Sequence, residues 1–282
     1  MRTRTRTSSV RAFDGEQLQF THPSEACACT MTVSVYLPPQ AKVGPVPVLW
    51  WLSGLSCSDQ NFVTKAGAQR YAAEHGIAII APDTSPRGAD IPGDPDGAWD
   101  FGIAAGFYVD ATEAPWAANY RMYTYIRDEL PGVLADLPLD FGRQGISGHS
   151  MGGHGAIVLA LRNPGRYRSV SAFSPIVAPS EVPWGHKALG RYLGPDPAAW
   201  RAYDATALIP GATERLPLLV DQGTADGFLD GQLQPWRLEA ACAAANHPLT
   251  LRMREGYDHS YFFVATYIGD HVAWHASALK AG

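Results

Sequence analysis

A serine between two glycines is the residue of this chain best suited to catalysis. Ser150 lies in residues 148–152, Gly-His-Ser-Met-Gly, after a short apolar run and before a helix-like run over 153–161. A Gly-x-Ser-x-Gly sequence between a strand and a helix is typical of a nucleophile elbow, where a strained turn exposes the serine hydroxyl. The pentapeptide alone is weak in a chain with 28 glycines. Its strand–turn–helix context is what makes Ser150 the predicted nucleophile.

A serine nucleophile needs a base, and the nine histidines leave one candidate in the expected place. In the α/β-hydrolase order, the acid and then the histidine follow the serine along the chain. His259 follows the last predicted strand and precedes the final helix, so it is the predicted base. The others lie before the serine, beside it, in an irregular segment, at a helix–strand junction or inside the last helix: His22, His75, His149, His154, His186, His247, His271 and His275.

The carboxylate that orients the histidine is expected in a loop after a late strand. Asp226 lies a few residues beyond the predicted strand 216–221 and is the predicted acid. Three alternatives stay open. Asp221 is nearer the strand and could be structural, Asp230 is a rival in the same region, and Asp258 is adjacent to the base but points poorly for a triad.

Two backbone N–H groups should stabilise the oxyanion that forms when a serine attacks a carbonyl. One is expected at Met151, directly after the nucleophile. The other is expected at Leu55, in the loop 53–57 that follows an apolar strand. An ordinary strand–helix connection would have the same spacing, so both interpretations of this loop stay open.

Alternating strand and helix patterns predict the scaffold that positions these groups. Strands separated by helices indicate an α/β protein with a doubly wound, mostly parallel sheet and helices on both faces, the α/β-hydrolase fold. The predicted strands are 32–37, 46–52, 77–81, the elbow strand before Ser150, 169–173, 216–221 and 249–253. The predicted helices are 61–75, 119–130, the helix after Ser150, 233–245 and 260–279.

The whole chain, 1–282, is predicted to be a single domain, although two smaller domains are compatible with its length. Three segments of the chain lack a clear periodic pattern. Residues 1–15 begin with an Arg-Thr repeat and are expected to be a flexible tail. Residues 175–215, rich in Trp and Pro, are expected to form a small irregular cap. Residues 83–117 form a long loop whose aromatic residues argue against disorder.

Composition excludes several classes of partner. The net charge of −5, from 22 basic and 27 acidic residues, favours neither nucleic acid nor an anionic membrane as a partner. No apolar stretch of the sequence approaches the length needed to span a membrane. The four cysteines have neither zinc spacing nor the density of a disulfide scaffold, so we expect no metal and free thiols in a reducing cytosol.

Seven segments together are far more specific than the pentapeptide. They are MTVSVYLPP at 31–39, WLSGLSCSD at 51–59, GFYVDAT at 106–112, GHSMGGHG at 148–155, PWGHKA at 183–188, DGFLDGQL at 226–233 and YDHSY at 257–261. In these segments the chain resembles the S-formylglutathione hydrolases, also called the esterase D family, over nearly all of residues 20–275. The loop 102–106 is less glycine-rich than the family pattern, and the Arg-Thr repeat lies outside it.

The resemblance implies hydrolysis of the thioester S-formylglutathione to glutathione and formate, the second step of formaldehyde detoxification. It also implies a cytoplasmic homodimer that uses no metal and no organic cofactor. Cys57 matches a cysteine beside the family's active site that is linked to sensitivity towards thiol reagents and copper. The family's catalytic residues would be the triad Ser150, Asp226 and His259, with backbone donors at Leu55 and Met151.

A formyl group has no side chain, so a small acyl pocket would select it by size. The candidate walls are Trp99, Phe107, Tyr108 and Trp184, although each could equally belong to the core of a loop or cap. A broader short-acyl carboxylesterase and an acyltransferase would use the same residues, so both stay open as alternatives. A non-catalytic binding protein is disfavoured by the intact Ser–Asp–His set.

Overall fold

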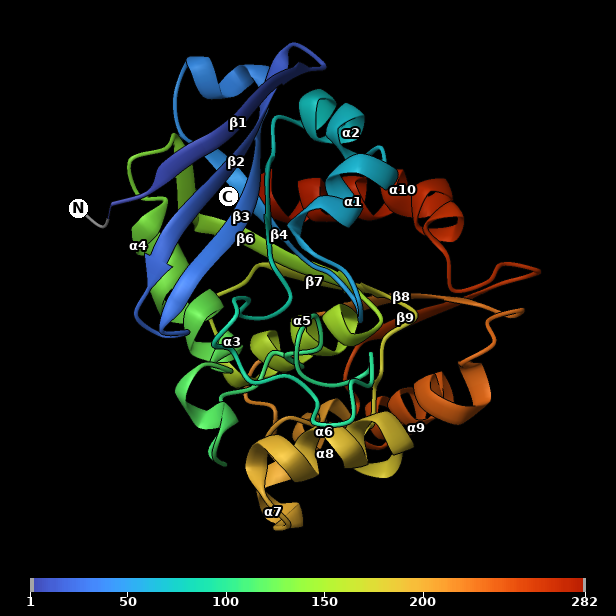
Figure 1. Ribbon diagram of the computed structural model, residues 1–282. Helices are drawn as coiled ribbons and strands as arrows, with labels where there is room; N and C mark the ends of the chain where they lie inside the picture. Colours follow the sequence, from blue (N-terminus) through green and yellow to red (C-terminus); the bar gives the residue numbers. More distant parts are fainter. Residues whose placement is uncertain (1–2, 281–282) are drawn as a thin grey trace.

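A nine-stranded sheet forms the centre of the protein, of which the computed structural model describes residues 3–280 (Figure 1). Its order is β1-β2-β3-β5-β4-β6-β7-β8-β9. The pairs from β5 to β9 are parallel, whereas β1, β2 and β3 are antiparallel to their neighbours. The predicted α/β-hydrolase fold is confirmed. The strands are β1 (Thr5–Ala12), β2 (Gly15–Ser24), β3 (Cys29–Leu37), β4 (Val46–Leu52), β5 (Ala78–Pro82), β6 (Leu139–His149), β7 (Ser169–Phe173), β8 (Leu218–Gly223) and β9 (Leu249–Arg254).

The central strands are buried on both faces, as their apolar runs predict. Every residue of β4, β5 and β7 is buried. Trp50 and Trp51 are neighbours on β4, yet they belong to two separate hydrophobic cores, because successive side chains of a strand point to opposite faces. A parallel sheet of this kind needs a layer of helices on each face.

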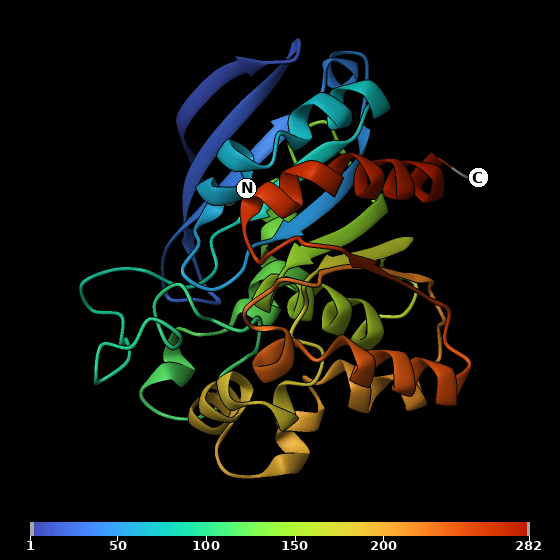
Figure 2. The same ribbon diagram turned by 90° about the vertical axis from the view of Figure 1, so that its right-hand side faces the viewer.

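Two layers of helices cover the sheet (Figure 2). One layer shares its core with Trp51 and consists of α1 (Asp59–Lys65), α2 (Ala68–His75) and α10 (Tyr261–Lys280). In the other layer, α5 lies directly against the sheet, and its residues from Met151 to Ala160 are all buried. The helices of that layer are α3 (Met122–Thr124), α4 (Leu130–Val133), α5 (Met151–Arg162), α6 (Pro183–Leu193), α7 (Pro197–Arg201), α8 (Ala205–Leu208) and α9 (Pro235–Ala245).

Several predicted elements differ in detail from those observed. The helix predicted at 61–75 is two helices, because Gly67 adopts a left-handed conformation (φ 65°) between α1 and α2. The helix predicted at 119–130 is shifted towards the C-terminus: it begins at Met122 and ends at Val133, and a π-helical turn at Tyr125–Glu129 links α3 to α4. The segment 175–215, expected to be irregular, holds the helices α6, α7 and α8.

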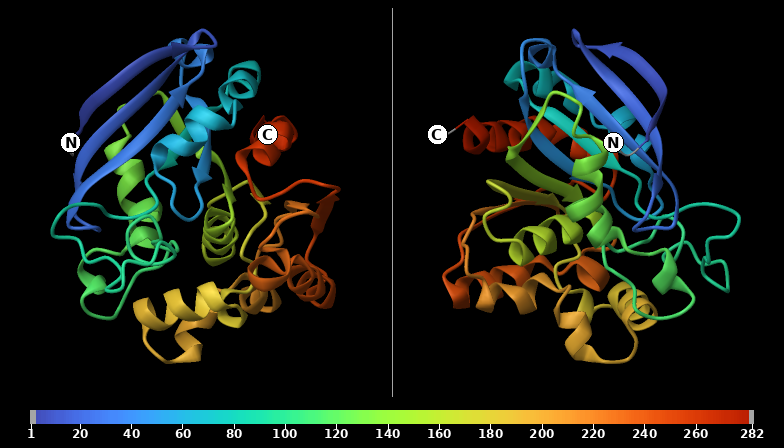
Figure 3. Two further views of the ribbon diagram at one scale, coloured as in Figure 1. Left: turned by 45° about the vertical axis from the view of Figure 1, so that its right-hand side comes forward. Right: turned by 90° about the vertical axis from the view of Figure 1, so that its left-hand side faces the viewer.

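The tail expected over residues 1–15 is wrong for the part that the structure describes. Residues 1 and 2 lie outside that part, but β1 pairs with β2 through a hairpin at the sheet edge (Figure 3). The side chains of β1 are nearly all exposed, so no apolar alternation marks the strand in the sequence. The two turn residues, Phe13 and Asp14, both have positive φ (47° and 59°), and a phenylalanine rarely adopts that conformation.

No helix among residues 3–280 combines the length and the apolar character needed to cross a lipid bilayer.

Candidate active site

The elbow serine lies in a strained turn between β6 and α5. Ser150 has φ 59° and ψ −120°, and its N–H donates to the Phe173 carbonyl oxygen on β7 at 2.9 Å. Both flanking glycines are required by close backbone contacts. A Cβ at Gly152 would lie 1.9 Å from the Leu52 carbonyl oxygen, and a Cβ at Gly148 would lie 2.3 Å from the Gly152 oxygen. The turn therefore presses against the end of β4, and only glycines fit there.

A carboxylate and an imidazole meet at the ends of β8 and β9, the last two strands of the sheet. Asp226 follows β8, His259 follows β9, and the Asp226 Oδ2 atom lies 2.6 Å from His259 Nδ1. The other carboxylate oxygen accepts the Phe228 N–H at 2.9 Å, and Gln222 Nε2 donates to Oδ2 at 3.2 Å. Asp226 is 5 % exposed, so its charge acts on the imidazole with little screening by water.

The electrostatics of this pair favour an ionised aspartate. Burial raises the pKa of Asp226, but the hydrogen bond and charge of His259 oppose it, and the net pKa lies below the usual value. A carboxylate on Nδ1 fixes the imidazole orientation and leaves Nε2 free for a proton from the nucleophile. The arrangement can therefore support general base catalysis.

Ser150 and His259 line the same cavity, which has a volume of about 320 Å³. They reach it from β6 and β9, which belong to the same parallel part of the sheet, so their carboxyl ends meet at one edge. The structure thus brings the three residues predicted for a triad to the carboxyl end of the parallel strands.

The three rival carboxylates lie away from His259 or bind other groups. Asp221 is fully buried and pairs with Arg252 at 2.5 Å and with Arg254 at 3.1 Å. Asp258 Oδ1 accepts the Ser260 N–H at 2.9 Å at the start of α10. Asp230 is exposed within a π-helical turn. None of these three carboxylates is paired with His259 within the described residues.

Both predicted oxyanion donors lie in segments close to the serine. Met151 is the first residue of α5, where a backbone N–H has no acceptor within the helix. Leu55 lines the cavity in the loop after β4, and a Cβ at Gly54 would lie 3.0 Å from Ser150 Cβ. The loop is held by the carbonyl of Cys57, which accepts from Thr84 Oγ1 at 2.5 Å and from Arg87 Nη2 at 2.9 Å.

Two of the four aromatic residues expected as pocket walls line the cavity. Trp99 and Trp184 do so, with their rings edge to face at 5.7 Å between centroids. Phe107 and Tyr108 do not, and this part of the expectation is wrong: both are fully buried in the core beneath the elbow helix. The Tyr108 ring occupies the space beside Gly155, where a Cβ would lie 2.5 Å from it.

Cys57 also lines the cavity, as expected, and it is a free thiol. Burial raises its pKa, although the Tyr261 hydroxyl and the Lys65 charge act in the opposite direction. A thiol with a raised pKa is mostly protonated at neutral pH and is therefore a weak nucleophile.

Sequence reasoning missed several residues that line the cavity. Phe228 packs its ring 4.7 Å from Trp184 and 5.1 Å from His259, and the imidazole of His149 lies 4.5 Å from that of His259. Phe228 stands two positions after Asp226 and His149 one before Ser150, so proximity to the catalytic motifs was the available signal. The other lining residues not predicted include Asn61, Lys65, Ser260 and Tyr261.

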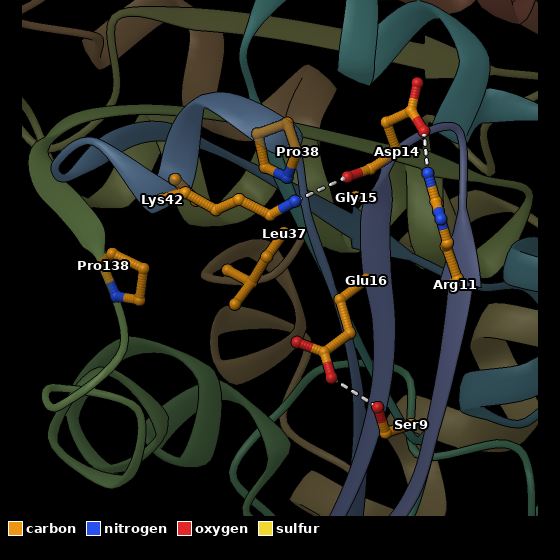
Figure 4. A pocket seen from close by; sticks show the side chains of 10 residues that line it. Ser9, Arg11, Asp14, Gly15, Glu16, Leu37, Pro38, Lys42 and Pro138 are labelled. Carbon is orange, nitrogen blue, oxygen red and sulfur yellow. Dashed lines mark hydrogen bonds and ion pairs between the residues drawn. The ribbon is translucent and has the colours of Figure 1, made fainter.

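A second cavity, of about 440 Å³, lies on the β1–β2 hairpin and shares no residue with the first (Figure 4). Arg11 pairs with Asp14, the Asp14 carbonyl oxygen accepts from Lys42 Nζ at 3.3 Å, and Glu16 accepts from the Ser9 hydroxyl. It holds neither a histidine nor a cysteine, so the chemistry is concentrated at the cavity of Ser150.

Comparison with known proteins agrees with this geometry. Residues 24–279 match the Esterase family model, described as "Putative esterase". The chain is 54% identical over 277 residues to the S-formylglutathione hydrolase of Mus musculus, covering 97% of this chain and 98% of that one. It is 53% identical to that of Bos taurus, with the same coverage.

A solved structure gives the same result. The S-formylglutathione hydrolase of Agrobacterium tumefaciens superimposes with a TM-score of 0.95 at 49% identity, covering 98% of this chain and 99% of that one. The elbow, the Asp–His pair and these similarities together show that the chain belongs to the S-formylglutathione hydrolase family of serine esterases.

Proposed function

We propose that this protein hydrolyses S-formylglutathione to glutathione and formate, with Ser150, His259 and Asp226 as its catalytic triad. The observation that carries the proposal is the 2.6 Å contact between Asp226 and His259, because the His259 side chain lines the same cavity as the elbow serine. The names of the relatives at 53% and 54% identity support the choice of substrate. The fold supports the reaction class, because the three groups follow in the order serine, acid, histidine.

In the first half of the reaction, Ser150 Oγ attacks the formyl carbon and its proton passes to His259 Nε2. The negative oxygen of the tetrahedral intermediate accepts hydrogen bonds from the N–H groups of Leu55 and Met151. When the C–S bond breaks, the departing sulfur takes the proton from His259 and leaves as glutathione. A thiol has a pKa of about 8.5, so it is a far better leaving group than an ordinary alcohol.

In the second half, water attacks the formyl-serine. His259 accepts a proton from the water, a second tetrahedral intermediate collapses, and the proton returns to Ser150 Oγ as formate leaves. Asp226 stays ionised throughout and stabilises the imidazolium that forms in each half. Its low pKa, caused by the hydrogen bond and charge of His259 against the effect of burial, supports this role.

The walls of the cavity support selection of a small acyl group. Trp184 is 8 % exposed, and Trp99 and Phe228 pack around it at the cavity. We assign these aromatic rings, with Cys57, to substrate binding. One extra methylene in a tight pocket costs about 10- to 100-fold in kcat/KM.

A steady-state comparison of S-formylglutathione, S-acetylglutathione and p-nitrophenyl acetate tests the substrate. We expect kcat/KM to be highest for the formyl thioester, by about 10-fold or more over the acetyl thioester. Equal values for formyl and acetyl substrates would instead indicate a broad short-acyl esterase. Formyl transfer to an added alcohol or thiol in preference to water would indicate an acyltransferase.

We further propose that the protein is a cytoplasmic homodimer of single-domain chains that removes the formaldehyde adduct of glutathione. The family resemblance supports the location, the dimer and the role, and the continuous nine-stranded sheet supports a single domain. Light scattering at micromolar concentration gives the mass, and a single unfolding transition is expected for one domain. Deletion of the gene should increase sensitivity to formaldehyde but leave growth without formaldehyde unchanged.

A further inference from the structure

One permanent charge lies in the wall of the Ser150 cavity. Of the fourteen residues that line it, Lys65 is the only lysine, arginine, aspartate or glutamate. Lys65 is the last residue of α1, and Asn61, one turn earlier on the same helix face, lines the cavity as well. The helix therefore presents an ammonium and an amide at the rim of an otherwise uncharged pocket.

Neighbouring contacts orient these two side chains. The Lys65 Nζ atom lies 5.8 Å from the centroid of the Tyr261 ring, which also lines the cavity. The Asn61 Oδ1 atom accepts the Ser58 N–H at 2.9 Å in a capping box, which leaves its amide nitrogen as the group to donate to a ligand. Cys57 lines the cavity too, and the Lys65 charge lowers the pKa of its thiol against the effect of burial.

Lys65 has no acidic partner in the part of the chain that the structure describes. Within residues 3–280, it forms no ion pair within 4.0 Å, whereas Lys187 binds both Asp94 and Asp100. The protein as a whole carries a net charge of −5. An unpaired cation at the mouth of a catalytic pocket on an acidic protein favours a substrate with an anionic group.

The proposed substrate has its charge in the leaving group. A formyl group is neutral, whereas the glutathione moiety carries two carboxylates and one ammonium. The γ-glutamyl carboxylate is next to that ammonium, so the glycyl carboxylate is the anion without an internal partner. We infer that Lys65 binds the glycyl carboxylate of glutathione, an assignment that rests on the proposed function. Lys65 thereby selects thioesters by their leaving group, while the aromatic walls select the acyl group.

The test removes the charge of residue 65 and the charge of the glycyl carboxylate, first separately and then together. S-formylglutathione and its glycyl ethyl ester differ only in that carboxylate, so their ratio of kcat/KM measures its contribution. We expect Lys65→Met to lower this ratio about fivefold, the upper range for an exposed ion pair, mainly through KM. Lys65→Arg should retain most of the ratio, and added salt should lower it in the wild type.

Lys42→Met is the matched control, because it removes the same charge at the separate cavity shown in Figure 4. It should leave the ratio unchanged. An equal loss on both substrates in Lys65→Met, or no loss on either, would overturn the assignment of Lys65. Failure of the proposed function is a different result: the wild type itself would then turn over neither S-formylglutathione nor its ester efficiently.

Discussion

Ser150, Asp226 and His259 are individually ordinary side chains, and their positions beyond the carboxyl ends of β6, β8 and β9 would give them a common function. We predict that Ser150→Ala lowers kcat by about 10⁵- to 10⁶-fold and that His259→Ala is nearly as damaging. Asp226→Asn should cost less, about 10⁴-fold. The rate of formate release in single-turnover experiments measures the loss of activity in each variant. The double variant Ser150→Ala/His259→Ala should be little worse than either single variant, and additive losses would contradict a triad.

The thiol of Cys57 provides a second test of geometry at the scale of one residue. We predict that a bulky maleimide on Cys57 inactivates the enzyme by filling the cavity, and that labelling is slow at pH 7 and faster at pH 9. The reason is that burial raises the thiol pKa. Mass spectrometry gives the site and extent of labelling. Stoichiometric modification of Cys57 with full activity would place this residue away from the substrate path.

At the scale of elements, the elbow depends on the contact between the start of α5 and the end of β4. We predict that Gly152→Ala destabilises the fold by about 3 kcal/mol, because its Cβ would lie 1.9 Å from the Leu52 oxygen. Gly132→Ala in α4 is the control, since nothing lies within 4 Å of its Cβ. It should be neutral or stabilise by about 0.5–1 kcal/mol. Similar urea midpoints for the two variants would show that the elbow tolerates a side chain.

The elements also show what could be predicted from the sequence. The buried strands β4 and β7 match their predicted bounds because continuous apolar runs mark strands covered on both faces. The strand β1 was missed, since its backbone pairs with β2 while its side chains face water. Phe107 and Tyr108 were misplaced for a related reason: an aromatic residue near the catalytic motifs can fill either a pocket wall or the core, and sequence spacing does not separate the two.

The triad itself was accessible because chain order restricts it. Each of the three residues stands just after a predicted strand, and parallel strands bring those ends together. No such signal marks Lys65 in the sequence, because its position in the cavity wall depends on which face of α1 meets the pocket. Tertiary packing decides which face of a helix meets a pocket. A helix of seven residues is too short for its sequence pattern to indicate that face.

Over the whole molecule, the helix layers are held partly by buried histidines that bond to the sheet and to the long loop 83–117. On α10, His275 is fully buried against β7, with Nδ1 2.7 Å from Ser169 Oγ and Nε2 2.8 Å from Ser171 Oγ. On α5, His154 is also fully buried, with Nε2 3.0 Å from the Phe107 carbonyl oxygen. Burial lowers the pKa of His275 to about 3 and that of His154 to about 4.

These pKa values make the whole fold sensitive to acid. In the unfolded chain a histidine has a pKa of about 6.5, so below that pH the unfolded state binds protons that the folded state does not. The stabilisation is complete above pH 6.5 and is lost as the pH falls from 6.5 towards 3. At pH 5.5 the loss of unfolding free energy is about 1.4 kcal/mol for each such histidine.

Urea unfolding at a series of pH values should show this decline in stability. His275→Gln should reduce its slope by about one proton, whereas Ser171→Ala, which removes a hydrogen bond but no titrating group, should lower stability equally at each pH. An unchanged slope in His275→Gln would mean that the helix α10 opens to admit a charged imidazole before the sheet unfolds.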